Sequence, residues 1–407
     1  MEVTLTAPRQ LEKAVIGKSY RVESIDLLRG LVMIIMALDH TRDFFFTNGM
    51  FQDPTNLATT TPVLFFTRWI THFCAPVFVF LAGTSAWFQK KRKSKAELSA
   101  FLIKRGLWLV LIELVVLTFA MTFNTDYRVF ILQTLWAIGT SMIILGLMLW
   151  LPYNIILITG LLIVLGHNTL DFYEAQHANQ PTSVLYHFLH QPYRWKLMPG
   201  HNVSIQYPFL PWAGLMMLGY CFGRLFSAYA AAQRKKMLKW AGFGILGFFI
   251  ALRATNFYGD PEHWHTQKNA LFTVFSFINT EKYPPSLLYI CMTIGPALLF
   301  VAYFDKMKNR LTEMITVYGR VPFFYYILHF FMIHTLCMIL FLGRGHTWAE
   351  GAHKPPGTGP LFTIKGEGYS LPIVYLIWLL VVISLYPLCK WFSEYKKTHS
   401  QWWVSYL

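Results

Sequence analysis

Apolar residues occur along the chain in long runs that are separated by short polar segments. A run of about 20 apolar residues can cross the ~30 Å hydrocarbon core of a bilayer as one helix. Such runs lie at residues 25–46, 62–88, 101–123, 130–150, 152–167, 207–228, 239–255, 285–304, 317–342 and 370–391. The pattern predicts an all-α fold, a polytopic transmembrane helical bundle of about ten helices.

No long polar stretch interrupts these runs, so we expect a single membrane domain over residues 24–392. Residues 1–23 are expected to form a cytoplasmic N-terminal segment, and residues 393–407 a cytoplasmic C-terminal tail. The N-terminal segment lacks the apolar core that a cleavable signal peptide needs. The first apolar run would therefore act as its own insertion signal.

Composition agrees with this prediction, since 55% of the residues are hydrophobic and 14% are charged, against about 25% charged in typical soluble proteins. The net charge of +15 does not indicate nucleic acid as a partner, because Lys and Arg stand in short blocks between apolar runs. These blocks are KKRKSK (90–95), QRKKMLK (233–239), KMKNR (306–310) and KK (396–397). By the positive-inside rule they place both termini in the cytoplasm and predict a multi-pass inner-membrane protein surrounded by the lipid bilayer.

The connections on the opposite side are longer and poorer in Lys and Arg. They cover residues 47–61, 168–206, 256–284 and 343–369. Long connections of this kind form either a vestibule for an extracytoplasmic substrate or partly ordered surface loops. The five cysteines show no CxxC and no paired spacing, so neither a disulfide nor a metal site is expected.

Several ionisable residues fall inside the apolar runs at a similar depth. Counted at ~1.5 Å per residue, His40, His72, Glu113 and His329 lie roughly 15 to 23 Å above the inner boundary of the hydrocarbon core. Four helices could thus bring three imidazoles and one carboxylate to a common layer. Each of these groups could also serve only as a hydrogen bond between helices.

The first run, SIDLLRGLVMIIMALDH (24–40), contains four ionisable residues. Asp26 and Arg29 are three residues apart and can pair near the cytoplasmic mouth, as a structural ion pair or as part of a site. Helical spacing places Arg29, Met33, Met36 and His40 on one stripe. This stripe is typical of the wall of a polar passage, since an ionisable group in hydrocarbon costs at least ~2.5 kcal/mol.

The buried imidazoles suit more than one chemistry. An imidazole oriented by a neighbour can act as the general base for acyl transfer from a thioester to a hydroxyl or amine. The same groups could relay protons in a proton-coupled transporter or flippase, or hold helices together in a structural or sensory protein. Serine nucleophile elbow, HExxH and Walker motifs do not occur in the sequence, which disfavours a soluble type of hydrolase or NTPase.

The motifs also resemble a known family. The first run is similar to the opening helix of a superfamily of membrane acyltransferases, and most resembles the bacterial branch related to heparan-alpha-glucosaminide N-acetyltransferase. Further stretches agree in order, namely FFTRWITHFCAPVFVFLAGTSAW (65–87), YPFLPWAGLMMLGYCFGR (207–224), KYPPSLLYICMTIGP (282–296) and YGRVPFFYYILHFFMIH (318–334). Where the lysosomal enzyme has a catalytic histidine in an HxSWNG stretch ahead of the second helix, this chain has Pro62 and its neighbours. The base is therefore assigned to His40 or His72.

The resemblance implies transfer of an acetyl group from cytosolic acetyl-coenzyme A, a co-substrate and not a bound cofactor, to an extracytoplasmic sugar or glycan. We expect His40 to be the general base, with His72 and His329 orienting it or the thioester, and Glu113 stabilising an imidazolium. The coenzyme is expected to bind near Asp26, Arg29, Lys91 and Arg92, with its phosphates attracted by Arg29, Lys91 and Arg92. Association of two chains as a homodimer is left open.

Overall fold

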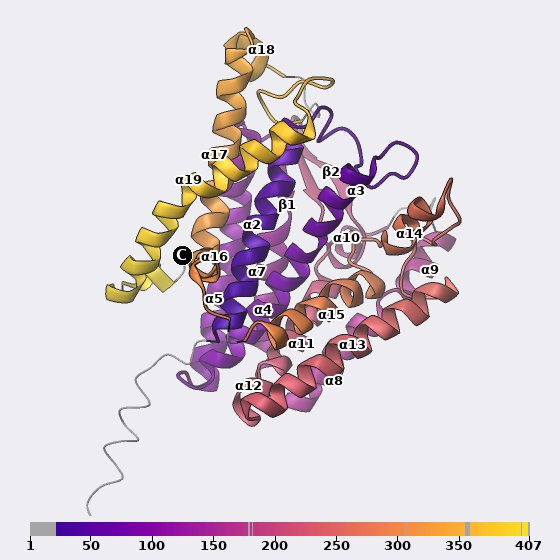
Figure 1. Cartoon of the computed structure of the whole chain (residues 1–407), viewed down its shortest axis with the longest axis vertical. Coiled ribbons are helices and arrows are strands. Elements are labelled where there is room, and N and C mark those ends of the chain that lie inside the picture. The colour runs from indigo at the N-terminus through magenta and orange to yellow at the C-terminus, as the bar shows by residue number, and fades with distance from the viewer. Residues whose placement is uncertain are drawn as a thin grey trace, which may run out of the picture.

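The computed structural model describes residues 22–177, 180, 182–305, 307–354, 359–399 and 401–405. Nearly all of the predicted N-terminal segment 1–23 lies outside these residues. The elements are α2 (Glu23–Phe45), α3 (Pro62–Trp69), η1 (Ile70–Phe73), α4 (Cys74–Gln89), α5 (Lys95–Ile112), η2 (Glu113–Leu117), α6 (Thr118–Thr122), β1 (Val129–Leu132), α7 (Thr134–Met148), α8 (Tyr153–Gly166), α9 (Thr169–Gln176), α10 (Val184–Leu189), β2 (Tyr193–Met198), β3 (His201–Ile205), α11 (Leu210–Phe222), α12 (Leu225–Ala228), α13 (Ala231–Thr255), α14 (Ala270–Ile278), α15 (Leu287–Tyr303), α16 (Arg310–Arg320), α17 (Pro322–Gly343), α18 (Trp348–Ala352), α19 (Leu371–Thr398) and η3 (Trp402–Ser405) (Figure 1).

The fold is mostly helical, and each predicted apolar run lies largely within helices. Among the described residues, four helical segments are long and apolar enough to cross a membrane: Pro62–Gln89, Ala231–Thr255, Pro322–Gly343 and Leu371–Thr398. The bent pair α8 and α9 would add a fifth. Other predicted spans, such as α7 and α15, are shorter apolar helices. The count of about ten spans therefore stays a prediction.

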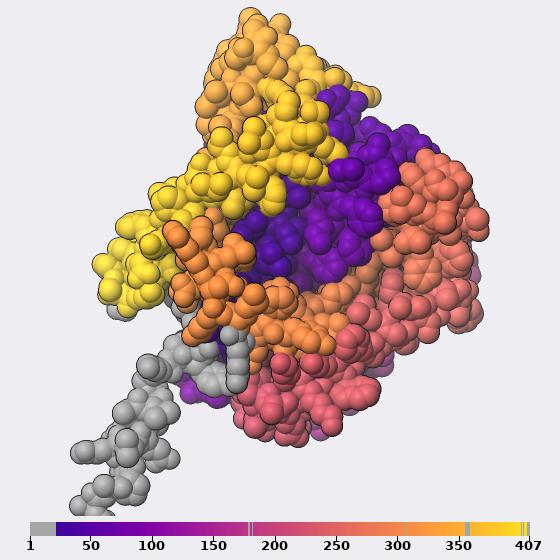
Figure 2. Space-filling model, in the orientation of Figure 1, coloured from indigo at the N-terminus to yellow at the C-terminus, as the bar shows by residue number. Residues whose placement is uncertain are grey.

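The outer surface is apolar, as expected for helices that face lipid. Figure 2 shows α19 on the outside of the bundle. Leu376 and Ile383 of this helix are 65% and 67% exposed. Exposure of large apolar side chains to water is unfavourable, so this face is suited to the hydrocarbon of a bilayer.

Two sequence predictions are wrong in detail. The all-α prediction omitted a sheet of order β1-β3-β2, in which β1 pairs in parallel with β3 and β2 pairs antiparallel with β3. Residues 130–132 belong to β1 and not to a helix, because their backbone pairs with a strand about seventy residues later. The predicted helix 317–342 is divided into α16 and α17 at Pro322, which has no N–H to continue the helical hydrogen bonds.

The bundle has two ends that differ in character. One end carries residues 46–61, 190–209 and 256–286, which include β2, β3 and α14, and we call it the loop end (Figure 1). The other end carries the basic blocks 90–95 and 233–239, and we call it the basic end. There, Asp305 accepts a hydrogen bond from Ser24 at the start of α2 (3.0 Å) and lies 3.6 Å from Arg234 at the start of α13.

Glycine pairs bring helix backbones into direct contact. A Cβ added at Gly30 of α2 would overlap the carbonyl group of Ile315, and one added at Gly319 of α16 would overlap the carbonyl oxygen of Asp26. Gly83 of α4 and Gly219 of α11 form an equivalent pair. Small residues at such contacts allow the close approach on which packing between membrane helices depends.

We predict that Gly219→Ala destabilises the protein by about 1–3 kcal/mol, because its Cβ would meet the backbone of Phe80 and force α4 and α11 apart. The midpoint of thermal unfolding in detergent should fall. Gly244→Ala in α13 is the matched control, since its Cβ meets nothing within 4 Å. Equal midpoints for the two variants would contradict the packing described here.

Candidate active site

A cavity of about 590 Å³ opens at the loop end. It is enclosed by α2, η1, α4 and the connections that follow α2, β3 and α14. Its ionisable lining residues are Asp39, His40, Arg42, Asp43, Asp53, Arg68, Cys74, Arg194, Tyr207, Lys282 and Tyr283. This loop-end cavity therefore combines an imidazole with a dense set of charged groups.

His40 of α2 lines the cavity and contacts α17. Its Nδ1 lies 2.7 Å from Nε2 of His329. His329 is fully buried, and its own Nδ1 lies 3.2 Å from the carbonyl oxygen of Tyr325 one turn earlier. The ring of Phe330 stacks on His40, with 4.2 Å between the centroids. Neighbouring positions of α17 thus hold the His40 ring in one orientation.

These contacts also assign the protons of the two imidazoles. A carbonyl oxygen only accepts, so Nδ1 of His329 carries a proton. In the neutral ring, Nε2 of His329 is then an acceptor, and Nδ1 of His40 must donate to it. Nε2 of His40 keeps its lone pair. Because His40 lines the cavity, this lone pair is available to a bound molecule, as a general base requires.

A network of ion pairs lies beside the His40 position. Asp39 accepts a hydrogen bond from Arg68 of α3, and its other oxygen lies 3.0 Å from Arg42 without the angle of a hydrogen bond. Arg42 also pairs with Asp43, and Arg68 donates to the Tyr283 hydroxyl at 3.3 Å. Charged groups in a membrane helix are tolerated when they pair in this way. The network fixes the wall of the cavity.

Lys282 adds a further cation to this wall. The residue is only 8% exposed and lines the cavity. Its ammonium lies 5.1 Å and 5.8 Å from the ring centroids of Tyr283 and Tyr207. Among the described residues, no carboxylate lies within ion-pair distance of it. This ammonium adds positive charge to the cavity wall, where it can interact with an anionic or polarised group.

Contacts with Asp260 stabilise the segment that carries Lys282. This carboxylate accepts hydrogen bonds from Ser286 (2.6 Å) and from the backbone N–H of Glu281 (2.9 Å), and lies 3.5 Å from Arg253. Burial raises the pKa of Asp260 to about 6 and that of Glu281 to about 7. Both carboxyl groups therefore titrate near neutral pH in the connection that carries Lys282.

A second cavity, of about 230 Å³, extends toward the basic end. Arg29, Ser85, Gln89 and Arg105 are among its polar lining residues. Arg29 lies 3.2 Å from Asp26, which confirms the predicted pair, and donates to Ser85 at 3.1 Å. This basic-end cavity provides cationic groups at the side opposite to the loop-end cavity.

The two cavities share part of their walls. Phe78 and Thr134 line both of them. Along α2, Arg29 and Met33 line the basic-end cavity, and Met36 and His40 line the loop-end cavity. The predicted stripe of four residues is thus present in the structure, with two residues in each cavity. Phe78 and Thr134 form the part of the wall that the two cavities share.

His72 and Glu113 were predicted to share a layer with His40 and His329, but neither residue lines the loop-end or the basic-end cavity. His72 is buried in η1 and does not line either cavity; its ring centroid lies 5.4 Å from that of Tyr289. Glu113 accepts hydrogen bonds from the backbone N–H groups of Gln133 (3.0 Å) and Leu135 (2.9 Å). Its place is therefore at the N-terminus of α7, where N–H groups lack helical partners. Among the described residues, the hydrogen-bond partners of the Glu113 carboxylate are backbone groups and not an imidazole.

Lys91 and Arg92 are exposed in the turn after α4 and do not line the basic-end cavity. The sequence analysis missed Arg68, Lys282 and Tyr283. Arg68 interrupts an apolar run, which is a signal in itself. Lys282 and Tyr283 begin the stretch KYPPSLLYICMTIGP (282–296), in which only the resemblance to the family gives a signal.

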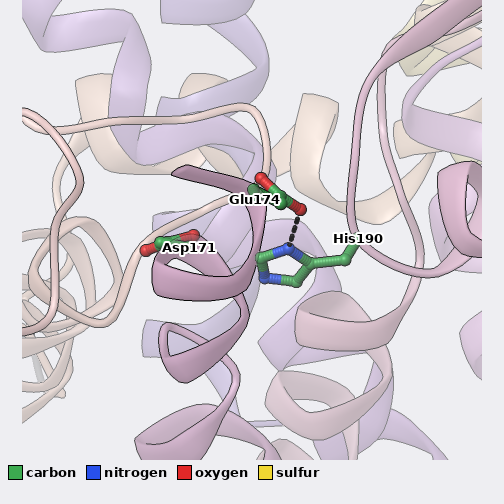
Figure 3. Close-up of side chains that lie close together, drawn as sticks. All are labelled: Asp171, Glu174 and His190. Atoms are coloured by element: carbon green, nitrogen blue, oxygen red, sulfur yellow. Dashed lines mark hydrogen bonds and ion pairs between the residues drawn. The ribbon is translucent and has the colours of Figure 1, made fainter. Parts of the chain in front are cut away.

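A further cluster of ionisable residues lies at α9 and α10. Asp171, Glu174 and His190 each place one ligand-type atom within 4.8 Å of the others (Figure 3). Nδ1 of His190 lies 2.8 Å from Glu174, which also accepts a hydrogen bond from Tyr186 at 2.9 Å. Asp171 accepts one from Asn168 at 2.7 Å. The cluster is therefore a hydrogen-bond network that joins α9 to α10.

Comparison with known proteins identifies a family for this chain. No curated protein matches the sequence. A model of the family described as "Heparan-alpha-glucosaminide N-acetyltransferase, catalytic" matches residues 21–259, more than half of the chain. The match includes Asp39, His40 and Arg68, and it ends before Lys282 and His329. The chain therefore belongs to the heparan-alpha-glucosaminide N-acetyltransferase catalytic family, and with its long apolar helices it is a membrane protein of that acetyltransferase family.

Proposed function

We propose that the protein is a multi-pass inner-membrane acetyltransferase that takes its acetyl group from cytosolic acetyl-coenzyme A. The acceptor is an amine or hydroxyl of an extracytoplasmic sugar or glycan bound in the loop-end cavity. The basic end faces the cytoplasm, and both termini are cytoplasmic. One observation carries the proposal: the His329 contact leaves the Nε2 lone pair of His40 facing a cavity lined by cations.

His40 supplies the general base in this reaction. Its Nε2 takes the proton of the acceptor amine or hydroxyl as that atom attacks the thioester carbonyl carbon. The new bond to carbon forms, the carbon–sulfur bond breaks, and the coenzyme leaves as a thiolate that receives the proton from His40. Arg68 and Lys282 supply positive charge near the carbonyl oxygen, on which negative charge develops in the transition state.

The donor enters through the basic-end cavity. Arg29 and Arg105 line it and are suited to the phosphates of the coenzyme, because guanidinium groups form strong hydrogen bonds to phosphate oxygens. Lys91 and Arg92 add positive charge outside this cavity. The thioester would meet the acceptor where Phe78 and Thr134 separate the two cavities.

We predict that His40→Ala lowers kcat for acetyl transfer by about 10²- to 10⁴-fold, because the base is lost. Release of coenzyme A thiol by the purified protein, with glucosamine as the acceptor, measures this change. His72→Gln is the comparison, since His72 lies outside the cavity, and it should keep most of the activity. Full activity in a folded His40→Ala protein would contradict the assignment. Proton flux without consumption of thioester in the wild type would favour a transporter instead.

His329 is a positioning residue in this account. His329→Leu removes the acceptor for the His40 proton, so His40 can adopt the tautomer that places its proton on Nε2. We expect kcat to fall by about 10²-fold or more with little change in KM. His329→Gln keeps an acceptor oxygen and should recover part of kcat. Equal values for the Leu and Gln variants would show that the contact only packs the two helices.

Arg29→Gln should raise KM for acetyl-coenzyme A on the order of 10-fold with kcat nearly unchanged, because a charge-assisted bond to phosphate is lost away from the reacting atoms. Lys235→Gln, exposed at the basic end, is the matched control for general surface charge. Steady-state kinetics over a range of coenzyme concentrations would give both constants. An unchanged KM in Arg29→Gln would place the coenzyme elsewhere.

A further inference from the structure

A separate groove lies at the basic end between α2, α16 and α19. Its volume is about 520 Å³. Its lining residues are Glu23, Leu27, Phe304, Met307, Lys308, Arg310, Thr312, Glu313, Met314, Thr316, Val317, Arg320, Tyr386 and Lys390. None of them lines the loop-end or the basic-end cavity. This basal groove therefore lies apart from the proposed active site.

Cationic residues outnumber carboxylates in the lining of the basal groove, since Lys308, Arg310, Arg320 and Lys390 stand against Glu23 and Glu313. Lys308 pairs with Glu23 at 3.0 Å. Arg310, Arg320 and Lys390 also line it, and among the described residues none of the three makes an ion pair. Three cations gathered around one hollow repel each other unless an anion lies between them.

Arg320 shows this most clearly. Its Nε is buried and has no hydrogen-bond partner among the described residues. The nearby carboxylate of Glu394 accepts its hydrogen bonds from Lys397, at 2.8 Å and 2.9 Å, and interacts with Arg320 only electrostatically. Glu313, also in the lining, is exposed and makes no ion pair with these cations among the described residues. Arg320 thus carries donors for which the described residues supply no acceptor.

The rim of the groove is apolar and aromatic. Leu311 and Met314 of α16 are 64% and 39% exposed, and Met307 just before this helix is 48% exposed. Trp391, next to Lys390 on α19, is 58% exposed. Apolar side chains beside Lys and Arg, with a Trp at the same level, are typical of the boundary between headgroups and hydrocarbon.

We propose that the basal groove binds the phosphate headgroup of an anionic phospholipid. Arg320 and Lys390 hold the phosphate from two different helices, and Met307, Leu311 and Met314 contact the acyl chains. Basic pockets between membrane helices bind anionic headgroups by this combination of charge and apolar surface. The lipid would join α19 to α16, and through Gly319 and Gly30 it would support the position of α2.

The test is lipid-dependent thermal unfolding of the purified full-length protein in detergent. Phosphatidylglycerol should raise the midpoint by about 2 to 4 °C over phosphatidylcholine, because a ligand that binds only the folded state stabilises it. The double variant Arg320→Gln with Lys390→Gln should lose this rise and keep its midpoint in phosphatidylcholine. Lys235→Gln with Lys236→Gln removes two exposed charges outside the groove and should keep the rise.

Several outcomes would overturn the proposal. The first is an equal rise with both lipids, or its loss in the Lys235 and Lys236 control, since either would indicate unspecific charge. A rise of the same size with inorganic phosphate would identify a free-phosphate site, and one with coenzyme A would identify a coenzyme site. If the double variant does not fold, Lys390→Gln alone should retain less phosphatidylglycerol than the wild type by native mass spectrometry, and unchanged retention would refute the site.

Discussion

The cost of placing ionisable side chains in an apolar helix constrains the whole structure. α2 carries such groups at both of its ends, and each needs a partner or a polar cavity. Arg29 pairs with Asp26 and donates a hydrogen bond to Ser85. Asp39 accepts a hydrogen bond from Arg68, and His40 lies within hydrogen-bond distance of a histidine of α17. Because these partners come from several elements, α2 must lie inside the bundle with α3, α4 and α17 around it. The polar interior that results is also the candidate active site.

Close backbone packing makes this enclosure possible. Gly30 and Gly319 allow α16 to touch α2 next to the Asp26 carbonyl group, and Gly83 and Gly219 do the same for α4 and α11. Side chains at these positions would push the helices apart and change the cavity walls that they carry. The packing therefore supports the fixed distance between the two imidazoles, on which the proposed tautomer of His40 depends.

The sequence could predict the helices and part of the site. Apolar runs reveal helices directly, and helical spacing was enough to place Arg29 and His40 on one stripe. It could not reveal that β1 pairs with a distant strand, or that a proline divides one apolar run into α16 and α17. Depth along separate helices does not determine which faces meet. His329 contacts His40, whereas Glu113, at a similar predicted depth, binds the backbone N–H groups at the N-terminus of α7.

In the proposed reaction, the two cavities form one route for an acetyl group across the membrane. Sealed vesicles that contain the protein test it directly, with acetyl-labelled coenzyme A outside and glucosamine trapped inside. For protein oriented with its basic end outward, we expect labelled N-acetylglucosamine inside and free coenzyme A thiol outside. Product that forms only when donor and acceptor share one compartment would contradict it.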